Sequence, residues 1–364
     1  MTSPSARVPL VGQLSLRWLL ILIPLSAVLL LLEPLVPRLE FLVFLASAGA
    51  LAPLAELIGA STEQIAIHAG PRTGGLLNAT FANVTELIVC IFLLAHGETA
   101  IVKTSLTGAI LGNLLLVLGV AFLAGGLRHR FQEYSAPAAG VHSTSLVLAV
   151  IGFLMPGLFL LTTGEHSFQQ REVVSGWVAI VLIVLYFAAL VFTHRNREHL
   201  FHRPQAQEHP ICSYAYAVWV LVLAAAVIAL ESELLVTALN PAVRVMGLSK
   251  FFVGFVLVPI VGNAAEHSSA VRFALRNKLD VTLEIAIGSS TQIALFVAPA
   301  LVFISLAVRH PMDFVFTTFE VAAVGVSTLI LALISHDGRS NWLEGAQLMA
   351  AYLIIAASSF FISL

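Results

Sequence analysis

The fold is decided by a short polar stretch that the chain contains twice, Ala82-Asn83-Val84-Thr85-Glu86 and Gly262-Asn263-Ala264-Ala265-Glu266. Both copies read N-x-x-E within otherwise apolar sequence. Each is followed by a second segment of polar residues and glycine, residues 108–113 in the first half of the chain and residues 288–292 in the second. A motif that returns together with its neighbour predicts that the two halves of the chain are structural repeats.

The sequence around these motifs is that of a membrane protein. Hydrophobic residues make up 59% of the 364 positions and charged residues 10%, whereas a soluble domain carries about 25% charged residues. Stretches of about 20 apolar residues can span a bilayer as a helix. About eleven such stretches occur, near residues 17–36, 40–68, 74–96, 104–127, 141–163, 173–194, 211–236, 250–271, 279–307, 314–335 and 342–363. Their length excludes a membrane β-barrel, so the sequence predicts an all-α polytopic membrane protein.

The two motifs fall in the third and the eighth predicted span. Because an odd number of spans separates them, the two copies run through the membrane in opposite directions. Transporters built from such inverted repeats bind their substrate near the membrane midplane, between the repeats. The sequence therefore predicts an inverted-topology transporter.

The basic residues predict how the chain lies in the membrane. Lys and Arg are enriched in cytoplasmic loops, and 12 of the 18 Lys and Arg residues fall on the side that carries the N-terminus. We therefore expect a cytoplasmic N-terminus, with membrane lipid as the surrounding partner. The net charge of −2 and the lack of a basic block in the sequence indicate no nucleic-acid partner.

Glu86 and Glu266 are the main candidates for binding a cation. An ionisable residue inside the membrane usually faces a partner or a wet cavity, because its burial in lipid costs about 3 kcal/mol or more. Asn83 stands three residues before Glu86, and Asn263 three residues before Glu266, so each pair shares one helix face. Two carboxylates and two amide oxygens would form an all-oxygen site, which suits Ca²⁺. The alternative is that these residues only join helices by hydrogen bonds.

The same carboxylates predict exchange for protons. Once the cation has left, two neighbouring carboxylates repel each other and are poorly solvated, so protons take the place of the cation. If both glutamates are reloaded, at least two protons move for each Ca²⁺.

Other polar residues of the predicted spans have two interpretations each. One set either lines the cavity opposite the glutamates or only packs between helices: Asn113, Ser289, Ser290 and Gln292. A second set either guards the access routes or is solvated at helix ends: Glu56, Glu63, Glu231 and Glu233. His267 is either a proton relay or an interior histidine with satisfied hydrogen bonds, and Glu284 is expected near a membrane surface.

The motifs resemble those of a known family. Residues 70–86, which read GPRTGGLLNATFANVTE, resemble the first signature repeat of the calcium/proton exchanger (CAX) family. Residues 259–267, PIVGNAAEH, resemble the second signature repeat, and residues 288–295, GSSTQIAL, resemble the segment that follows it. The likeness extends from about Ala52 to Val302.

This resemblance implies a leading helix (residues 1–38), a five-helix repeat (39–195), a cytoplasmic connector (196–210) and a second, inverted five-helix repeat (211–364). It also implies export of Ca²⁺ in exchange for protons by alternating access, without a cofactor, with Glu86 and Glu266 as the shared ion-binding pair. Ala82 replaces a glycine that is commoner in the family, and the connector lacks the acidic helix of eukaryotic members. The short chain is similar to prokaryotic members, which implies the plasma membrane.

Other functions are weighed against this one. A sodium-coupled exchanger, or an exchanger of another cation for protons, is the nearest alternative. It would need further ligands for sodium around the central site. A channel is disfavoured by the closed midplane site expected of inverted repeats. An enzyme is not indicated, because the sequence has no H-E-x-x-H, G-x-S-x-G or P-loop motif. The sequence does not decide between Ca²⁺, Mn²⁺ and Mg²⁺, or between a monomer and a homo-oligomer.

Overall fold

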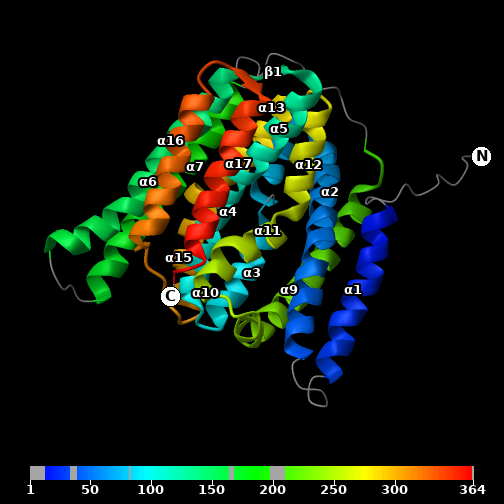
Figure 1. Cartoon of the computed structure of the whole chain (residues 1–364). Helices are drawn as coiled ribbons and strands as arrows, with labels where there is room; N and C mark the ends of the chain where they lie inside the picture. Colours follow the sequence, from blue (N-terminus) through cyan, green and yellow to red (C-terminus); the bar gives the residue numbers. More distant parts are fainter. Residues whose placement is uncertain (1–12, 33–38, 82, 164–167, 197–209, 363–364) are drawn as a thin grey trace, which may run out of the picture. The chain divides into compact units, whose positions relative to one another are not determined.

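The computed structural model describes residues 13–32, 39–81, 83–163, 168–196 and 210–362, and nearly all of them are helical (Figure 1). The α-helices are α1 (Gln13–Leu32), α2 (Leu39–Phe81), α3 (Val84–Ala95), α4 (Thr99–Leu111), α5 (Leu118–His129), α6 (Ala136–Thr163), α7 (Phe168–Arg195), α9 (Tyr214–Met246), α10 (Lys250–Phe252), α11 (Val258–Gly262), α12 (Ala264–Leu275), α13 (Leu279–Leu283), α14 (Ser289–Gln292), α15 (Ala298–Ala307), α16 (Thr318–Ile334) and α17 (Trp342–Ser359). These residues also form π-helical turns and short strands, namely η1 (Gly112–Val117), η2 (Val253–Leu257), η3 (Glu284–Gly288), η4 (Ile293–Val297), β1 (Phe131–Glu133) and β2 (Arg339–Asn341).

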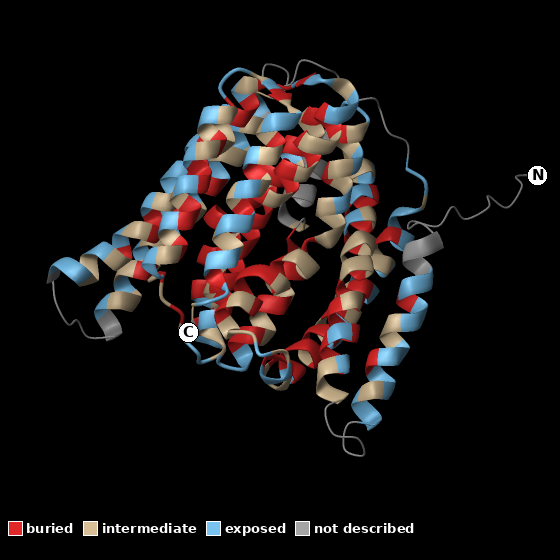
Figure 2. Ribbon diagram, in the orientation of Figure 1, coloured by how far each residue is buried: buried red, intermediate tan, exposed pale blue. Residues whose placement is uncertain are grey.

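Each predicted span coincides with a helix or with a run of consecutive helices, so the all-α architecture is confirmed. In the described part of the chain, six helices are long and apolar enough to cross a membrane, or seven if the bent pair Lys250–Gly262 and Ala264–Leu275 is one span. Exposed positions, pale blue in Figure 2, occur along many of the helices. They include large apolar side chains such as Trp177, Leu223 and Leu333, as expected of surfaces that face lipid. The total of about eleven spans stays a prediction.

One predicted boundary is wrong. The seventh predicted span ends at residue 236, ahead of the polar pair Asn240-Pro241, but α9 continues to Met246 with Pro241 inside it. The helix ends at Gly247, which has a φ of 65°. Glycine adopts this left-handed conformation without strain and is the usual residue at a helix C-terminus. Glu231 and Glu233 therefore lie well inside a helix and not at its end.

The chain forms two compact units, and each takes elements from both halves of the sequence. The first unit comprises Met1–Phe92 and Gln205–Gly247, and the second comprises Leu93–Pro204 and Leu248–Leu364. In the first unit, α2 packs against α1 and along α9. In the second unit, α5 packs against α12 and α17, and α4 packs against η2. The predicted division into consecutive five-helix repeats remains a prediction, and most of the predicted connector, residues 197–209, lies outside the described residues.

Two glycines allow a close contact between α4 and η2 in the second unit. A Cβ atom at Gly108 would overlap the carbonyl oxygen of Phe255 and lie 2.7 Å from its carbonyl carbon. A Cβ atom at Gly254 would overlap Thr104 Oγ1. Small residues let membrane helices approach each other closely. Because Gly108 and Gly254 come from different halves of the sequence, this contact joins the two halves directly.

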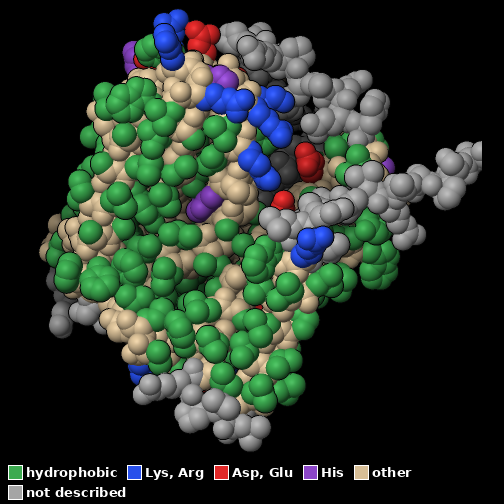
Figure 3. Space-filling view, turned by 45° about the vertical axis from the view of Figure 1, so that its right-hand side comes forward, with side chains coloured by type: hydrophobic (Ala, Val, Ile, Leu, Met, Phe, Trp, Pro, Cys, Tyr) green, Lys and Arg blue, Asp and Glu red, His purple; other side chains and the backbone are tan. Residues whose placement is uncertain are grey.

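One end of the second unit carries an excess of basic residues. At this end β1 pairs with β2, Gln132 Nε2 donates to the carbonyl oxygen of Ala274 (2.8 Å), and Asp280 Oδ1 accepts from the backbone N–H of Ser135 (2.7 Å). The turns and helix ends joined in this way carry exposed basic residues: Arg128, Arg130, Arg272, Arg276, Lys278 and Arg339. We call this region the basic end, and Figure 3 shows Lys and Arg side chains gathered at the top of the view, above a largely hydrophobic surface.

The opposite end of the second unit is electrically balanced by ion pairs. Lys103 Nζ pairs with Asp313 at 2.6 Å, and Lys250 Nζ pairs with Glu98 at 2.9 Å. The six exposed basic residues of the basic end all belong to the side of the membrane to which the sequence assigns the N-terminus, whereas Lys103 and Lys250 are assigned to the other side.

Candidate cation-binding site

The second N-x-x-E motif lies where a helix is broken. α11 ends at Gly262, Asn263 leaves the helical conformation (φ −106°, ψ 12°), and α12 begins at Ala264 after a bend of 60°. Glu266 thus stands in the first turn of α12. The amide nitrogen of Asn263 donates to the carbonyl oxygen of Pro259 (3.1 Å), so the side chain caps the helix that ends. The side-chain carbonyl oxygen of Asn263 takes no part in this hydrogen bond.

The first motif has the same local structure. α3 begins at Val84, directly after Asn83, and holds Glu86 in its first turn. The backbone carbonyl oxygen of Asn83 accepts from the backbone N–H of Leu87 (3.0 Å), as the backbone carbonyl oxygen of Asn263 accepts from the backbone N–H of His267 (2.9 Å). Both Asn83 and Glu86 are buried, whereas Ala82 lies outside the described residues. A sequence motif that repeats has therefore folded twice in the same way, once in each unit.

The second unit brings residues from three helices to its motif. Ser289 Oγ of α14 donates to Glu266 Oε2 (3.2 Å), and His267 Nε2 of α12 lies 3.2 Å from Asn113 Oδ1 of η1. Because a carbonyl oxygen only accepts, His267 is the donor through Nε2. The buried Asn113 Nδ2 has no hydrogen-bond partner among the described residues, which leaves it able to bind a water molecule or a carboxylate. Asn113 and Ser289, for which the sequence left cavity lining and helix packing as alternatives, are thus joined to the motif segment.

The other two residues of that set are placed differently. Ser290 Oγ donates to the carbonyl oxygen of Ala286 in the preceding turn, η3 (2.9 Å), and lies 3.5 Å from the carbonyl oxygen of Ile110 in α4. Gln292 is buried at the end of α14. π-helical turns adjoin these positions, since η1 contains Asn113, η3 ends just before Ser289 and η4 begins just after Gln292. Such turns insert an extra residue into a helix and occur often at functional sites.

The acidic residues expected on access routes all lie in the first unit. Glu56 of α2 and Glu233 of α9 are partly buried, and Glu63 of α2 is exposed. Glu231 of α9 is fully buried and accepts a hydrogen bond from Ser26 Oγ of α1 (2.8 Å). Solvation at a helix end is therefore wrong for Glu231, because α9 extends beyond the predicted boundary.

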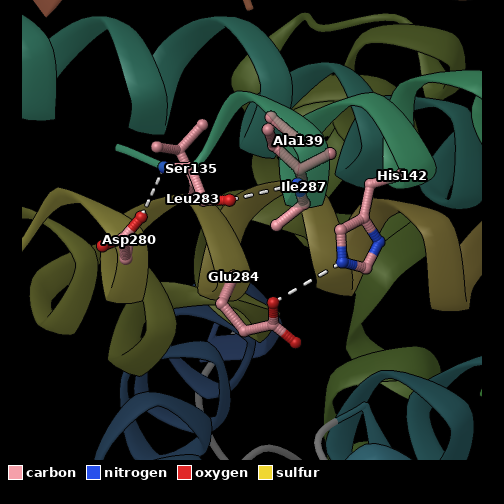
Figure 4. A pocket seen from close by; sticks show the side chains of 8 residues that line it. Ser135, Ala139, His142, Asp280, Leu283, Glu284 and Ile287 are labelled. Atoms are coloured by element: carbon pink, nitrogen blue, oxygen red, sulfur yellow. Dashed lines mark hydrogen bonds and ion pairs between the residues drawn. The ribbon is translucent and has the colours of Figure 1, made fainter. Parts of the chain in front are cut away.

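One pocket of the second unit is not indicated by any motif of the sequence (Figure 4). It is a small pocket of about 10 Å³, which is room for about one water molecule, and its lining includes Ser135, His142, Asp280 and Glu284. Glu284 Oε2 lies 3.5 Å from His142 Nε2. Glu284 was expected near a membrane surface, and nothing in the sequence connected it with His142. The four-residue spacing of Asp280, Glu284 and Gly288 was the available signal.

In the described part of the chain, no three His, Cys, Asp or Glu side chains are placed to hold a metal ion together. The family assignment decides between a transporter and other kinds of membrane protein. The family described as sodium/calcium exchanger protein matches residues 39–194 and 216–361 of the sequence. The chain belongs to the sodium/calcium exchanger protein family.

This exchanger-family chain is 41% identical over 338 residues to a Ca(2+)/H(+) antiporter of Aphanothece halophytica, with 88% of this chain and 91% of that protein aligned. It is 44% identical over 313 residues to the Ca(2+)/H(+) antiporter ChaA of Bacillus subtilis, with 84% and 88% aligned. The solved structure of native YfkE superimposes with a TM-score of 0.82 at 38% identity, over 96% of this chain and 100% of that chain.

Several predictions are confirmed by these similarities. The likeness to calcium/proton exchangers that the motifs indicated is confirmed, as is the fold of an integral membrane exchanger. The similar proteins are transporters. The individual roles of the motif residues stay predictions: Asn83, Glu86, Asn263 and Glu266.

Proposed function

We propose that this chain is an antiporter that exports Ca²⁺ from the cytoplasm in exchange for protons, with Glu86 and Glu266 binding both ions in turn. The observation that carries the proposal is the duplicated local structure, in which a helix starts directly after an Asn and holds a Glu in its first turn. The named activity of the relatives, which align with 84–88% of the chain, supplies the identity of the two ions.

The geometry suits both ions. The N-terminus of a helix favours negative charge, because the backbone N–H groups there are directed toward it. A glutamate in the first turn can therefore stay ionised while it binds a cation. Ser289 supports this state at Glu266 by donating a hydrogen bond to the carboxylate. When Ca²⁺ leaves, the carboxylates bind protons, at least two for each Ca²⁺ if both are reloaded.

The proposal includes an orientation. The basic end of the second unit fits the cytoplasmic side, because Lys and Arg are enriched in cytoplasmic loops. The order of spans in the sequence assigns the N-terminus to the same side as these basic residues, so the proposal takes it as cytoplasmic, and the relatives from bacteria support a prokaryotic plasma membrane.

Uptake of radioactive calcium into everted membrane vesicles tests the proposal. An acid-inside gradient should drive uptake by the wild type, and Glu86→Gln and Glu266→Gln should each abolish it. Glu133→Gln is the matched control, since it removes an exposed carboxylate far from either motif in sequence. Uptake that survives either motif substitution at wild-type rate would refute the assigned site.

Sodium is the competing driving ion, because the family includes sodium/calcium exchangers. The same vesicles, loaded with sodium at equal pH on both sides, separate the two. Calcium uptake under the sodium gradient alone would show that sodium, and not protons, drives the exchange. Uptake only under the proton gradient supports the proposal.

A further inference from the structure

Two turns at the basic end are fastened to each other. The segment that follows α5 and the segment that follows α12 are joined by hydrogen bonds between described residues. His129 Nε2 lies 3.0 Å from the carbonyl oxygen of Leu275. Gln132 Nε2 donates to the carbonyl oxygen of Ala274 (2.8 Å) and to the side-chain oxygen of Asn277 (2.9 Å). The two turns therefore form one connected surface of the second unit.

Four exposed cationic side chains stand on these two turns. Arg128 and Arg130 lie at the C-terminal end of α5, and Arg276 and Lys278 lie between α12 and α13. We call these four residues the basic cluster. Within the described part of the chain, their side chains form no hydrogen bond and no ion pair. Because like charges gathered on adjoining turns repel one another, an anion bound among them would be favoured.

The acidic side chains of the same region are directed at other groups. Glu133 Oε1 pairs with Arg339 at 3.3 Å. Asp280 Oδ1 accepts from the backbone N–H of Ser135 (2.7 Å), and Asp337 Oδ1 accepts from the backbone N–H of Arg339 (3.0 Å). The counter-ion of the basic cluster must therefore come from outside these turns.

Exposed apolar side chains lie beside the basic cluster. Leu127 and Phe131 flank its two arginines in sequence and are 69% and 68% exposed. Trp342 of α17 is 48% exposed and adjoins α5, since a Cβ atom at Gly126 would overlap its backbone nitrogen. Phe131 also stands next to α17, because it pairs with Asn341 across the ribbon of β1 and β2. Cations and large apolar side chains are thus exposed together at this end.

One exposed face of α17 continues the apolar surface away from the basic end. Leu343, Ala350 and Ile354 are exposed and follow one another at intervals of seven and four residues, which places them on one side of the helix. Figure 3 shows hydrophobic side chains directly below the Lys and Arg side chains of the basic end. A phospholipid matches this combination, because its phosphate group lies at the membrane surface and its acyl chains run along the helices.

We propose that the basic end binds an anionic phospholipid, whose phosphate group is held by the basic cluster and whose acyl chains lie against Leu127, Phe131 and α17. Clusters of Lys and Arg beside membrane helices bind anionic headgroups in this way. Phosphatidylglycerol fits because it carries a net negative charge, whereas the choline group of phosphatidylcholine cancels the charge of its phosphate. An inorganic anion or a nucleic acid would use the cations but leave the apolar side chains in water. Binding of this lipid requires neither Ca²⁺ nor a proton gradient, so it is independent of the proposed exchange.

Quenching of Trp342 fluorescence tests the proposal, because bromine atoms on an acyl chain quench a tryptophan that they contact. The full chain is reconstituted in phosphatidylcholine vesicles that contain increasing fractions of brominated phosphatidylglycerol or of brominated phosphatidylcholine. The signal of Trp342 is obtained as the difference between each protein and the same protein with Trp342→Phe. For the wild type, we expect brominated phosphatidylglycerol to quench this signal at a mole fraction about tenfold lower than brominated phosphatidylcholine.

Two pairs of substitutions test the basic cluster, namely Arg128→Gln with Arg130→Gln and Arg276→Gln with Lys278→Gln. One basic residue contributes up to about fivefold to binding at an anionic surface, so each pair should abolish most of a tenfold preference. Replacement of Arg128 and Arg130 by Lys should retain most of it, since the charges remain. The matched control is Arg309→Gln, which should change nothing. Arg309 is exposed and has the same φ of 61° as Arg130, but it lies near Asp313 at the opposite end of the unit.

Equal quenching by the two brominated lipids in the wild type, or a preference that survives the removal of all four charges, would overturn the proposal. Inorganic phosphate and a short DNA duplex test other occupants, in detergent without added lipid. If either raises the thermal unfolding midpoint as much as phosphatidylglycerol does, the site does not select a lipid and the proposal fails, whereas no effect of either supports it. If one glutamine pair does not fold, the pair on the other turn gives the same test. A wild type that lacks proton-driven calcium uptake would refute the exchange function and leave the lipid preference as measured.

Discussion

The contact between α4 and η2 gives a quantitative prediction for Gly108→Ala. The new methyl carbon would overlap the carbonyl oxygen of Phe255 and lie 2.7 Å from its carbonyl carbon and 2.9 Å from its Cα atom. Ordinary van der Waals contacts of a Cβ atom begin at 3.4 Å, so the two helices must separate by about 0.7 Å even to relieve the carbonyl-carbon contact. The new methyl carbon is attached to the backbone of one helix and meets backbone atoms of the other, so no change of side-chain rotamer can relieve the contact. Overpacking of this kind costs about 1–3 kcal/mol of stability.

Two other glycine substitutions calibrate the effect. Gly254→Ala meets the hydroxyl of Thr104, which can rotate away, so its cost should be smaller. Gly176→Ala on α7 has open space around the new methyl group and should be neutral or slightly stabilising, because alanine favours a helix over glycine by about 1 kcal/mol. The thermal unfolding midpoint in detergent, followed by tryptophan fluorescence, should fall in the order Gly176→Ala, Gly254→Ala, Gly108→Ala.

The result that would refute this reasoning is a Gly108→Ala protein as stable as Gly176→Ala. The two helices would then not be in backbone contact at this point. Transport provides a second measure, because α4 runs directly into η1 with Asn113. A separation of α4 from η2 should therefore lower calcium uptake in proportion to the loss of stability.

Two further predictions concern single hydrogen bonds. Ser289→Ala removes the hydroxyl that donates to Glu266. In the vesicle assay we expect a severalfold higher half-saturating Ca²⁺ concentration for this variant, with a normal yield of protein. An unchanged half-saturating concentration would mean that Ser289 only packs between helices. Burial, together with the charges of Asp337 and Glu344, raises the pKa of Tyr134, which lies outside the spans and donates to the carbonyl oxygen of Ile334 (3.0 Å). Because the folded-state pKa is above the unfolded value of about 10, this stabilisation is complete below pH 10 and declines as the pH rises above it. The unfolding midpoint of the wild type should thus fall more steeply between pH 9 and 11 than that of Tyr134→Phe, and parallel curves would contradict this assignment.

Hydropathy predicted where the helices are, because long apolar runs have no other stable structure in lipid. It did not predict where they break. The bend at Asn263 and the π-helical turns next to Asn113, Ser289 and Gln292 depend on packing between helices that are distant in sequence. The C-terminal end of α9 was misplaced for a related reason, since a Pro that usually ends a helix is accommodated inside this one.

The part of the candidate site that could be predicted from the sequence is the part whose motif occurs twice. Asn83, Glu86, Asn263 and Glu266 were found because the same spacing occurs twice in apolar sequence. His142 belongs to no such pattern, and its approach to Glu284 depends on how α6 packs against η3. Residues that act through a partner on another helix give no signal in one sequence unless that partner is already suspected.

The hydrogen bond between Ser26 and Glu231 gives the leading helix, α1, a structural role. α1 stands outside the two predicted repeats and resembles an optional addition to them. Without α1, the carboxyl group of Glu231 would lose its hydroxyl donor and part of the protein that encloses it, and a carboxylate facing hydrocarbon costs about 3 kcal/mol or more. A chain that lacked α1 should therefore be more stable with an apolar residue at position 231 than with Glu231.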